Sequence, residues 1–141
     1  MHEIIDSALG LYQATYQDVQ FERNYDDALP SARLDPEQMK RVFVNLIDNA
    51  LEAMGSKGEI AIATSYLAPL QMMRVEVADD GPGIRPEDKE KLFLPYFSTK
   101  KRGTGLGLAI VNRIISDHHG YIRVEDNRPR GTRFIIELPA A

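Results

Sequence analysis

The chain has 141 residues, of which 43% are hydrophobic and 27% charged, so it can form one domain around a single core. Its formal net charge of −4 argues against a general nucleic-acid or anionic-membrane surface, and the absence of cysteine excludes disulfides, thiolate metal sites and thiol nucleophiles. No apolar run approaches the roughly 18 residues that a membrane-spanning helix needs. We therefore expect a cytoplasmic domain that contacts neither nucleic acid nor membrane, although the full-length protein can still be membrane-anchored.

The first half of the chain predicts a helix, a strand and a longer helix. Apolar residues at helical spacing predict a short amphipathic helix over residues 1–13, and alternating apolar and polar residues predict a strand over 19–23. Asp35 is suited to cap a helix and Pro36 to occupy its first position, so they start the longer helix, which ends near residues 55–58. This helix has an apolar stripe along one side, which we expect to be buried.

The second half of the chain predicts two antiparallel hairpins with two helices between them. Strands are expected at residues 59–66, 72–78, 121–125 and 132–138, and helices at residues 86–92 and 106–118. The elements do not alternate strictly as βαβ units. They predict an α+β fold, a two-layer α/β sandwich in which helices cover one face of a mixed, mostly antiparallel sheet.

Two asparagines lie on the polar side of the longer helix. Asn45 and Asn49 are four residues apart, so both side chains project from one face. Amide oxygens at this spacing suit a hard cation that keeps several waters and takes its other ligands from nucleotide phosphates, which describes Mg²⁺. The alternative interpretation is an ordinary solvated face.

A carboxylate and two glycines directly follow the predicted strand 72–78. Asp79 at this position could accept a hydrogen bond from an exocyclic amine, so it would select adenine over guanine, and such a bond to a charged group is worth about 1.5–3 kcal/mol. Gly81 and Gly83 would allow the backbone to approach a base closely. The alternative is a plain Asp-Gly turn.

Three further glycines precede the helix at 106–118. Gly103, Gly105 and Gly107 leave backbone amides uncovered at a helix start, where phosphates bind. The loop is not a Walker A motif, because no Gly-Lys-Ser/Thr follows. A flexible hinge is the alternative interpretation.

These motifs, taken in this order, resemble the ATP-binding catalytic domain of sensor histidine kinases, within the superfamily that includes DNA gyrase, heat-shock chaperones and mismatch-repair ATPases. NLIDNALEA resembles its N box, DDGPGI its first glycine box, LFLPYFSTK its phenylalanine box and GTGLGLAI its second glycine box. The resemblance covers about residues 35–139 and is greatest to the nitrogen-sensing branch. It implies the Bergerat-type ATP-binding fold.

The resemblance also implies roles in binding ATP and Mg²⁺. Asn49 would hold the metal, with Asn45 assisting at the metal and phosphates. Asp79 would accept the adenine amine, helped by Thr132 through a water, and Lys100 or Arg102 would meet the terminal phosphates. The base pocket and lid would be shaped by Gly81, Gly83, Ile84, Gly103, Thr104, Gly105, Leu106 and Gly107.

Phe93 and Phe97 would act as hinges of a lid spanning about residues 85–104, although ordinary core packing is an alternative for both. Many relatives have a basic residue and an aromatic residue at the positions of Glu52 and Ala53, so we expect weaker nucleotide affinity here.

The family's ATP-hydrolysing members have a glutamate at the Asn45 position. An amide cannot accept a proton, so we expect a poor ATPase that transfers phosphate to a neutral imidazole, which needs no base. No proline follows His2 as it would in an acceptor box, and too little chain lies between His2 and the N box for a helical hairpin. His118 and His119 fit capping or surface positions. The acceptor should therefore lie on a separate phosphoacceptor and dimerisation domain of the same full-length protein.

Residues 1–17 would be a linker or N-terminal helix from that domain, and residues 18–141 the catalytic domain. A response regulator would take the phosphoryl group downstream. The alternatives are an anti-sigma-type protein serine kinase and a non-catalytic nucleotide-sensing module.

Overall fold

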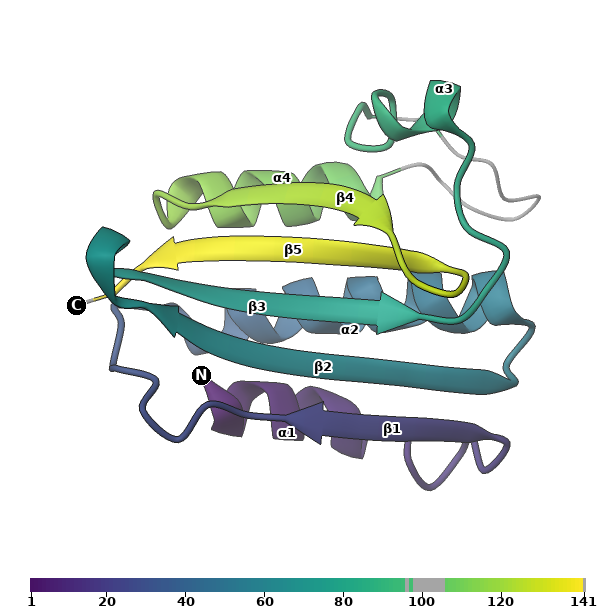
Figure 1. Cartoon of the computed structure of the whole chain (residues 1–141), viewed down its shortest axis with the longest axis horizontal. Coiled ribbons are helices and arrows are strands. Elements are labelled where there is room, and N and C mark those ends of the chain that lie inside the picture. Colours follow the sequence, from purple (N-terminus) through teal and green to yellow (C-terminus); the bar gives the residue numbers. More distant parts are fainter. Residues whose placement is uncertain (96, 98–105, 141) are drawn as a thin grey trace.

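Five strands form one mixed sheet in the computed structural model, which describes residues 1–95, 97 and 106–140 (Figure 1). The strands are β1 (Val19–Asn24), β2 (Gly58–Leu67), β3 (Met72–Asp79), β4 (Tyr121–Asp126) and β5 (Thr132–Pro139). Their order is β1-β2-β3-β5-β4, and only the β1–β2 pair is parallel. The predicted α+β sandwich with a mostly antiparallel sheet is confirmed.

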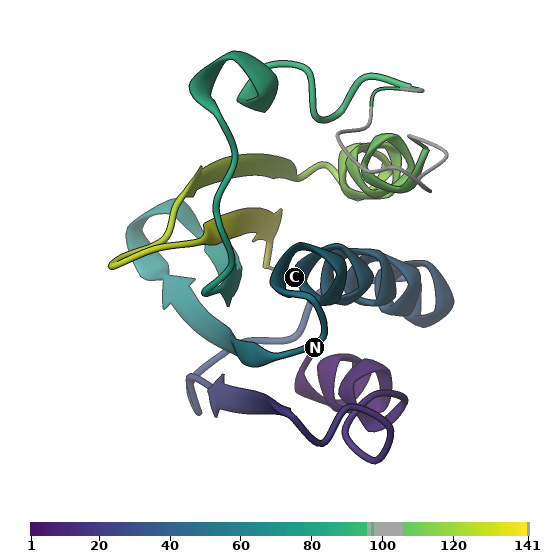
Figure 2. The same cartoon turned by 90° about the vertical axis from the view of Figure 1, so that its right-hand side faces the viewer.

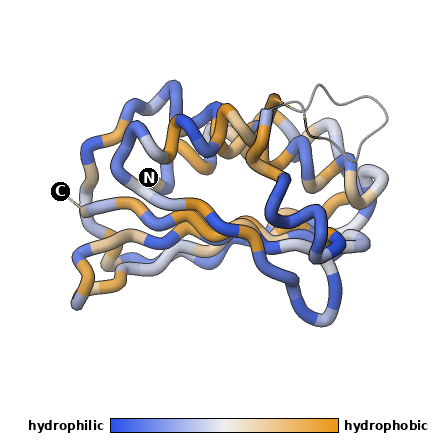
Figure 3. The backbone as a smooth tube through the Cα atoms, turned by 90° about the horizontal axis from the view of Figure 1, so that it is seen from above, coloured by the Kyte–Doolittle hydropathy of each residue, from blue (hydrophilic) through white to orange (hydrophobic). Residues whose placement is uncertain are grey.

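Three helices lie side by side over one face of the sheet, so the domain has two layers, each with recurring apolar residues (Figures 2 and 3). They are α1 (His2–Gly10), α2 (Pro36–Met54) and α4 (Gly107–Asp117). A short 3₁₀ helix, η1 (Ala68–Leu70), joins β2 to β3, and the short helix α3 (Pro86–Lys89) lies at the end of the sheet where β3 ends. None of the helices in the described ranges is long and apolar enough to cross a bilayer.

Two helices are shorter than their sequence patterns indicate. The first ends at Gly10 rather than near residue 13, which agrees with the poor helix propensity of glycine, and α3 passes into turns after Lys89. Ile5 and Leu9 of α1 are completely buried in the common core. That α1 also leads from a dimerisation domain stays a prediction.

The longest helix, α2, is built as its sequence predicts. The Asp35 side chain accepts hydrogen bonds from the amides of Glu37 and Gln38, and Gly55 ends the helix in the left-handed conformation. Its buried stripe lies between the other two helices and the sheet. The stripe consists of Met39, Val42, Phe43, Leu46, Ile47, Ala50 and Leu51.

His118 connects the end of α4 to the start of α2. Its Nδ1 lies 2.8 Å from the Ile114 carbonyl oxygen, and its Nε2 accepts a hydrogen bond from the Asp35 amide at 3.0 Å. The ring therefore caps its own helix, as expected, and also fixes the entry of the neighbouring helix.

Gly131, directly before β5, packs closely against Asp79 at the end of β3. Gly131 has φ +107°, and a Cβ built there would lie 1.9 Å from the Asp79 carbonyl oxygen. Only a residue without a side chain allows this approach, so the position of Gly131 determines how closely β5 packs on the strand that carries Asp79.

We expect Gly131→Ala to lower the free energy of unfolding by about 2–4 kcal/mol, because it adds both an unfavourable φ and a steric overlap. Urea unfolding followed by circular dichroism measures this. Gly10→Ala is the control, because a Cβ there meets nothing within 4 Å; it should change stability by less than about 1 kcal/mol. Equal stability of the two variants would contradict the close approach.

Candidate functional site

The end of β3 holds a buried carboxylate. Asp79 is only 5% exposed, and its Oδ1 accepts hydrogen bonds from the amides of Gly81 at 2.9 Å and Thr132 at 3.3 Å. Both of these donors reach the same oxygen, and among the residues that the structure describes none donates a hydrogen bond to Oδ2. Thr132 thus contacts Asp79 directly through its backbone amide. The expected contact through a water stays a prediction.

Burial raises the pKa of the Asp79 carboxyl above its ordinary value of 3.8. The amides of Gly81 and Thr132 oppose this rise, because they stabilise the ionised form, while the neighbouring Asp80 adds to it. Asp80 itself is exposed, and its Oδ1 accepts from the Glu59 amide at 3.1 Å. Of the two adjacent aspartates, therefore, only Asp79 has a buried carboxylate, and two backbone amides hold it.

The two glycines after Asp79 allow the turn to pack against the rest of the domain. A Cβ at Gly81 would lie 3.0 Å from Asp79 Oδ1 and 3.4 Å from Met54 Cγ of α2. Gly83 has φ +85°, a conformation that favours glycine. The turn is therefore held between α2 and the segment that leads into β5.

The asparagine pair lies half-buried on α2. Asn45 donates through Nδ2 to the carbonyl oxygen of Gly107 at 3.4 Å, which joins α2 to the first residue of α4. Among the described residues, none donates a hydrogen bond to the amide oxygen of Asn45. Asn49 lies one turn further along the same face.

The chemistry of this donor set fits Mg²⁺. Amide oxygens are hard ligands, and a magnesium ion usually has only one or two protein ligands, with waters and substrate phosphates completing its shell. Within the described ranges, no group of three or more His, Cys, Asp or Glu side chains could hold a metal ion. Any cation here would thus depend on asparagine oxygens and on its ligand's phosphates.

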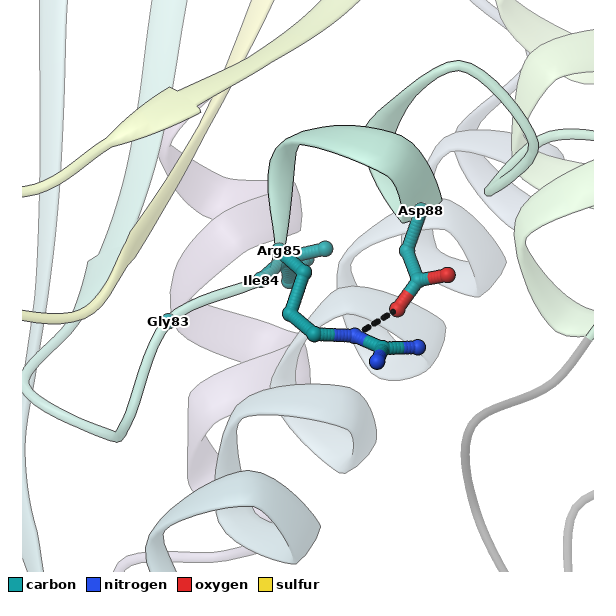
Figure 4. Close-up of a pocket in the computed structure, with 4 residues that line it drawn as sticks. All are labelled: Gly83, Ile84, Arg85 and Asp88. Atoms are coloured by element: carbon teal, nitrogen blue, oxygen red, sulfur yellow. Dashed lines mark hydrogen bonds and ion pairs between the residues drawn. The ribbon is translucent and has the colours of Figure 1, made fainter.

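A pocket of about 330 Å³ opens directly after the glycine turn (Figure 4). It is lined by Gly83, Ile84, Arg85 and Asp88, and the last two side chains point toward each other, with Arg85 Nε 3.0 Å from Asp88 Oδ2. Ile84 was a predicted site residue. The Arg85–Asp88 pair was not, although its opposite charges at i,i+3 spacing are a signal for it.

The phenylalanine motif packs on the core. The Phe93 ring meets Phe134 of β5 edge-on, with centroids 6.3 Å apart, and Phe97 is partly buried against the same core. Core packing is therefore present, and the hinge role of both stays a prediction. Leu106 is the N-cap residue of α4. The predicted Lys100, Arg102, Gly103, Thr104 and Gly105 lie outside the described residues.

The connection between β4 and β5 contributes contacts that sequence reasoning missed. Asn127 donates through Nδ2 to the Asp79 carbonyl oxygen at 2.8 Å, and Arg130 donates through Nε to the Gly81 carbonyl oxygen at 3.0 Å. Lys89 of α3 forms an ion pair with Asp126 at 2.7 Å. In the sequence Asn127 and Arg130 indicated only a turn, and no local pattern marks the partners of any of these residues.

The structure thus gathers most of the predicted site at one end of the sheet, where β3 ends and α4 begins (Figure 1). Asp79, Gly81 and Thr132 are in direct hydrogen-bonded contact, and a Cβ at Gly83 would lie 3.4 Å from the Gly131 carbonyl oxygen. Asn45 and Gly107 form a second contact on the helix side. The candidate site therefore has a carboxylate on the sheet side and two asparagine amides on the α2 side.

Comparison with known proteins identifies the family to which the chain belongs. Residues 34–141 match the model of the "Histidine kinase-, DNA gyrase B-, and HSP90-like ATPase" family. The sensory histidine kinase/phosphatase NtrB of Rhodobacter capsulatus is 38% identical in an alignment that covers 100% of this chain and 43% of the relative. The chain spans less than half the length of the curated relatives it matches.

Solved structures agree with the sequence match. The catalytic domain of histidine kinase ThkA superposes with a TM-score of 0.88 at 38% identity, over 99% of this chain and 91% of that one. ThkA in complex with the response regulator protein TrrA superposes with a TM-score of 0.84 at 35% identity, over 100% of this chain and 40% of that one. The chain therefore belongs to the histidine kinase-, DNA gyrase B- and HSP90-like ATPase family, as one of its histidine kinase catalytic domains.

Proposed function

We propose that this domain binds ATP with Mg²⁺ and transfers the γ-phosphoryl group to a histidine on a separate phosphoacceptor and dimerisation domain, for relay to a response regulator. The observation that carries the proposal is the buried Asp79 carboxylate, whose Oδ1 is held by two backbone amides while Oδ2 remains for a ligand. A fixed, buried acceptor discriminates between bases because a wrong base would leave it unpaired.

The side chains of α2 would serve the triphosphate. Asn49 would hold Mg²⁺, and Asn45, anchored through Nδ2 to Gly107, would present its oxygen to the same ion. The metal would neutralise charge on the phosphates. Neither asparagine can act as a base, so the domain's contribution is to orient the phosphates for in-line attack by an external nucleophile.

A histidine acceptor fits this arrangement better than a serine. Neutral imidazole attacks without losing a proton, whereas a serine hydroxyl needs a base, and position 45 holds an amide. The nitrogen-sensing kinase NtrB among the relatives and the response regulator bound to ThkA support the same branch and the same partner class for this chain.

Asn49→Ala should reduce phosphotransfer to a supplied acceptor domain at least about 100-fold while leaving the fold intact, because the metal loses a ligand. Labelled ATP and a gel readout measure it, and the label on the acceptor should be acid-labile and base-stable.

Asn112→Ala is the control for that variant. Asn112 is an exposed asparagine on α4, far from Asn49 in sequence, and its replacement should leave transfer unchanged. Normal transfer by Asn49→Ala would refute the metal assignment, and an acid-stable label would refute the histidine acceptor.

Asp79→Asn should weaken ATP binding by about 10- to 100-fold, the equivalent of one hydrogen bond to a charged group. The amide replaces the carboxylate in shape, but it offers an N–H where the adenine amine needs an acceptor. Isothermal titration calorimetry with ATP and Mg²⁺ measures the affinity. Asp80→Asn, at the exposed neighbour, is the control and should bind ATP as tightly as the wild type does. Equal losses of ATP affinity in both variants would show that the net charge of the protein, and not recognition of the base by Asp79, determines affinity.

Acidification should have opposite effects on binding and stability. Because the pKa of Asp79 is raised in the folded state, its carboxylate becomes protonated at a higher pH than an ordinary aspartate with pKa 3.8. As the pH falls below the raised pKa, the ATP affinity of the wild type should decrease, while that of Asp79→Asn should not show this decrease. Unliganded wild type should gain stability relative to the same variant, since the folded state then binds more protons than the unfolded state.

Calorimetry and thermal unfolding of both proteins across the acidic range test these two trends. Phosphate protonation is common to both proteins and cancels in the comparison. Parallel pH profiles for wild type and Asp79→Asn would contradict the raised pKa.

A further inference from the structure

We propose that Asn127 and Arg130, in the connection between β4 and β5, are positioning residues that hold the base-reading carboxylate of Asp79 in its productive orientation. The inference rests on the proposed function, because it concerns how that site discriminates between purines. Neither side chain needs to touch the nucleotide; both act through the backbone around Asp79.

The first contact fixes the peptide that follows Asp79. Asn127 Nδ2 donates to the Asp79 carbonyl oxygen at 2.8 Å, across 48 positions of sequence. The carbonyl and the carboxylate belong to the same residue, so holding the peptide plane restricts the direction in which Cα–Cβ projects. The half-buried Asn127 is thus placed to set the angle of the carboxylate without contacting it.

The second contact fixes the turn that donates to the carboxylate. Arg130 Nε donates to the Gly81 carbonyl oxygen at 3.0 Å, and the amide of the same Gly81 donates to Asp79 Oδ1 at 2.9 Å. A glycine has no side chain to restrain it, so its two peptide planes need external partners to stay in one orientation. Arg130, in the connection between β4 and β5, provides such a partner.

The connection itself is well anchored, so it can act as a fixed reference. The Asn127 amide donates to the Gly131 carbonyl oxygen at 3.0 Å, which closes the turn. Gly131 packs directly on the Asp79 carbonyl, and the Thr132 amide donates to Asp79 Oδ1. The segment 127–132 therefore meets Asp79 at both its carboxylate and its carbonyl, and only Asn127 does so through a side-chain donor.

The test compares ATP with inosine triphosphate, in which a carbonyl replaces the adenine amine. Asn127→Asp keeps the side-chain shape but removes the N–H donor. We expect this variant to lower the ATP-over-ITP affinity ratio by about 5- to 10-fold, with ITP affinity within about twofold of wild type. Titration calorimetry of the domain with each nucleotide and Mg²⁺ gives both affinities.

Arg130→Ala is the second variant, because Arg130 is exposed and its removal leaves no buried gap. It should lower the same ratio in the same direction. Arg128→Ala is the matched control: it removes one exposed arginine from the same turn, and the ratio should stay at the wild-type value. Thermal unfolding of all variants separates a change in selectivity from a loss of folded protein.

The possible results distinguish the two proposals. If wild type prefers ATP and both Asn127→Asp and Arg130→Ala keep the full preference, the positioning role is wrong and the proposed function stands. If a variant loses ATP and ITP affinity equally, the contacts only stabilise the fold and the positioning role is again wrong. If wild type binds the two nucleotides equally, Asp79 does not read the base, and both proposals fail.

Discussion

The site depends on the burial of one carboxylate at the end of a strand. A carboxylate that is 5% exposed is costly unless donors replace the water it has lost, and Asp79 receives two backbone amides on one oxygen. These donors come from two different segments, the turn at Gly81 and the start of β5. The glycine turn, the close approach at Gly131 and the pairing of β5 with β3 all serve to bring them together.

Helix α2 combines stability and chemistry in a single element. Its apolar stripe is buried between sheet and neighbouring helices, while Asn45 and Asn49 are half-buried and Asn45 contacts the first residue of α4. The packing that stabilises α2 therefore also fixes the two asparagines relative to Asp79, because α2 packs on the sheet that carries Asp79. Preorganisation of this kind lowers the entropic cost of orienting a ligand.

Local patterns predicted most of the fold and part of the site. Periodicity placed α2 and both hairpins, and the Asp35 cap is a signal contained within four residues. Contacts between distant segments could not be predicted. The bond from Asp35 to His118 spans 83 positions and that from Asn127 to Asp79 spans 48, and both depend on how the sheet and helices pack. The motif order predicted Asp79 and Asn45 as site residues, but it gave no indication of the residues that contact them.

The sheet order places Asp79 on β3, which has β2 on one side and β5 on the other. Fraying begins at the outermost strands, here β1 and β4, and exposes the middle of a sheet only when the whole domain opens. The proposed reading of the purine by Asp79 would therefore depend on the central strand of the sheet and not on an edge strand. Local opening of β1 or β4 would leave the hydrogen bonds of the Asp79 carboxylate to Gly81 and Thr132 in place.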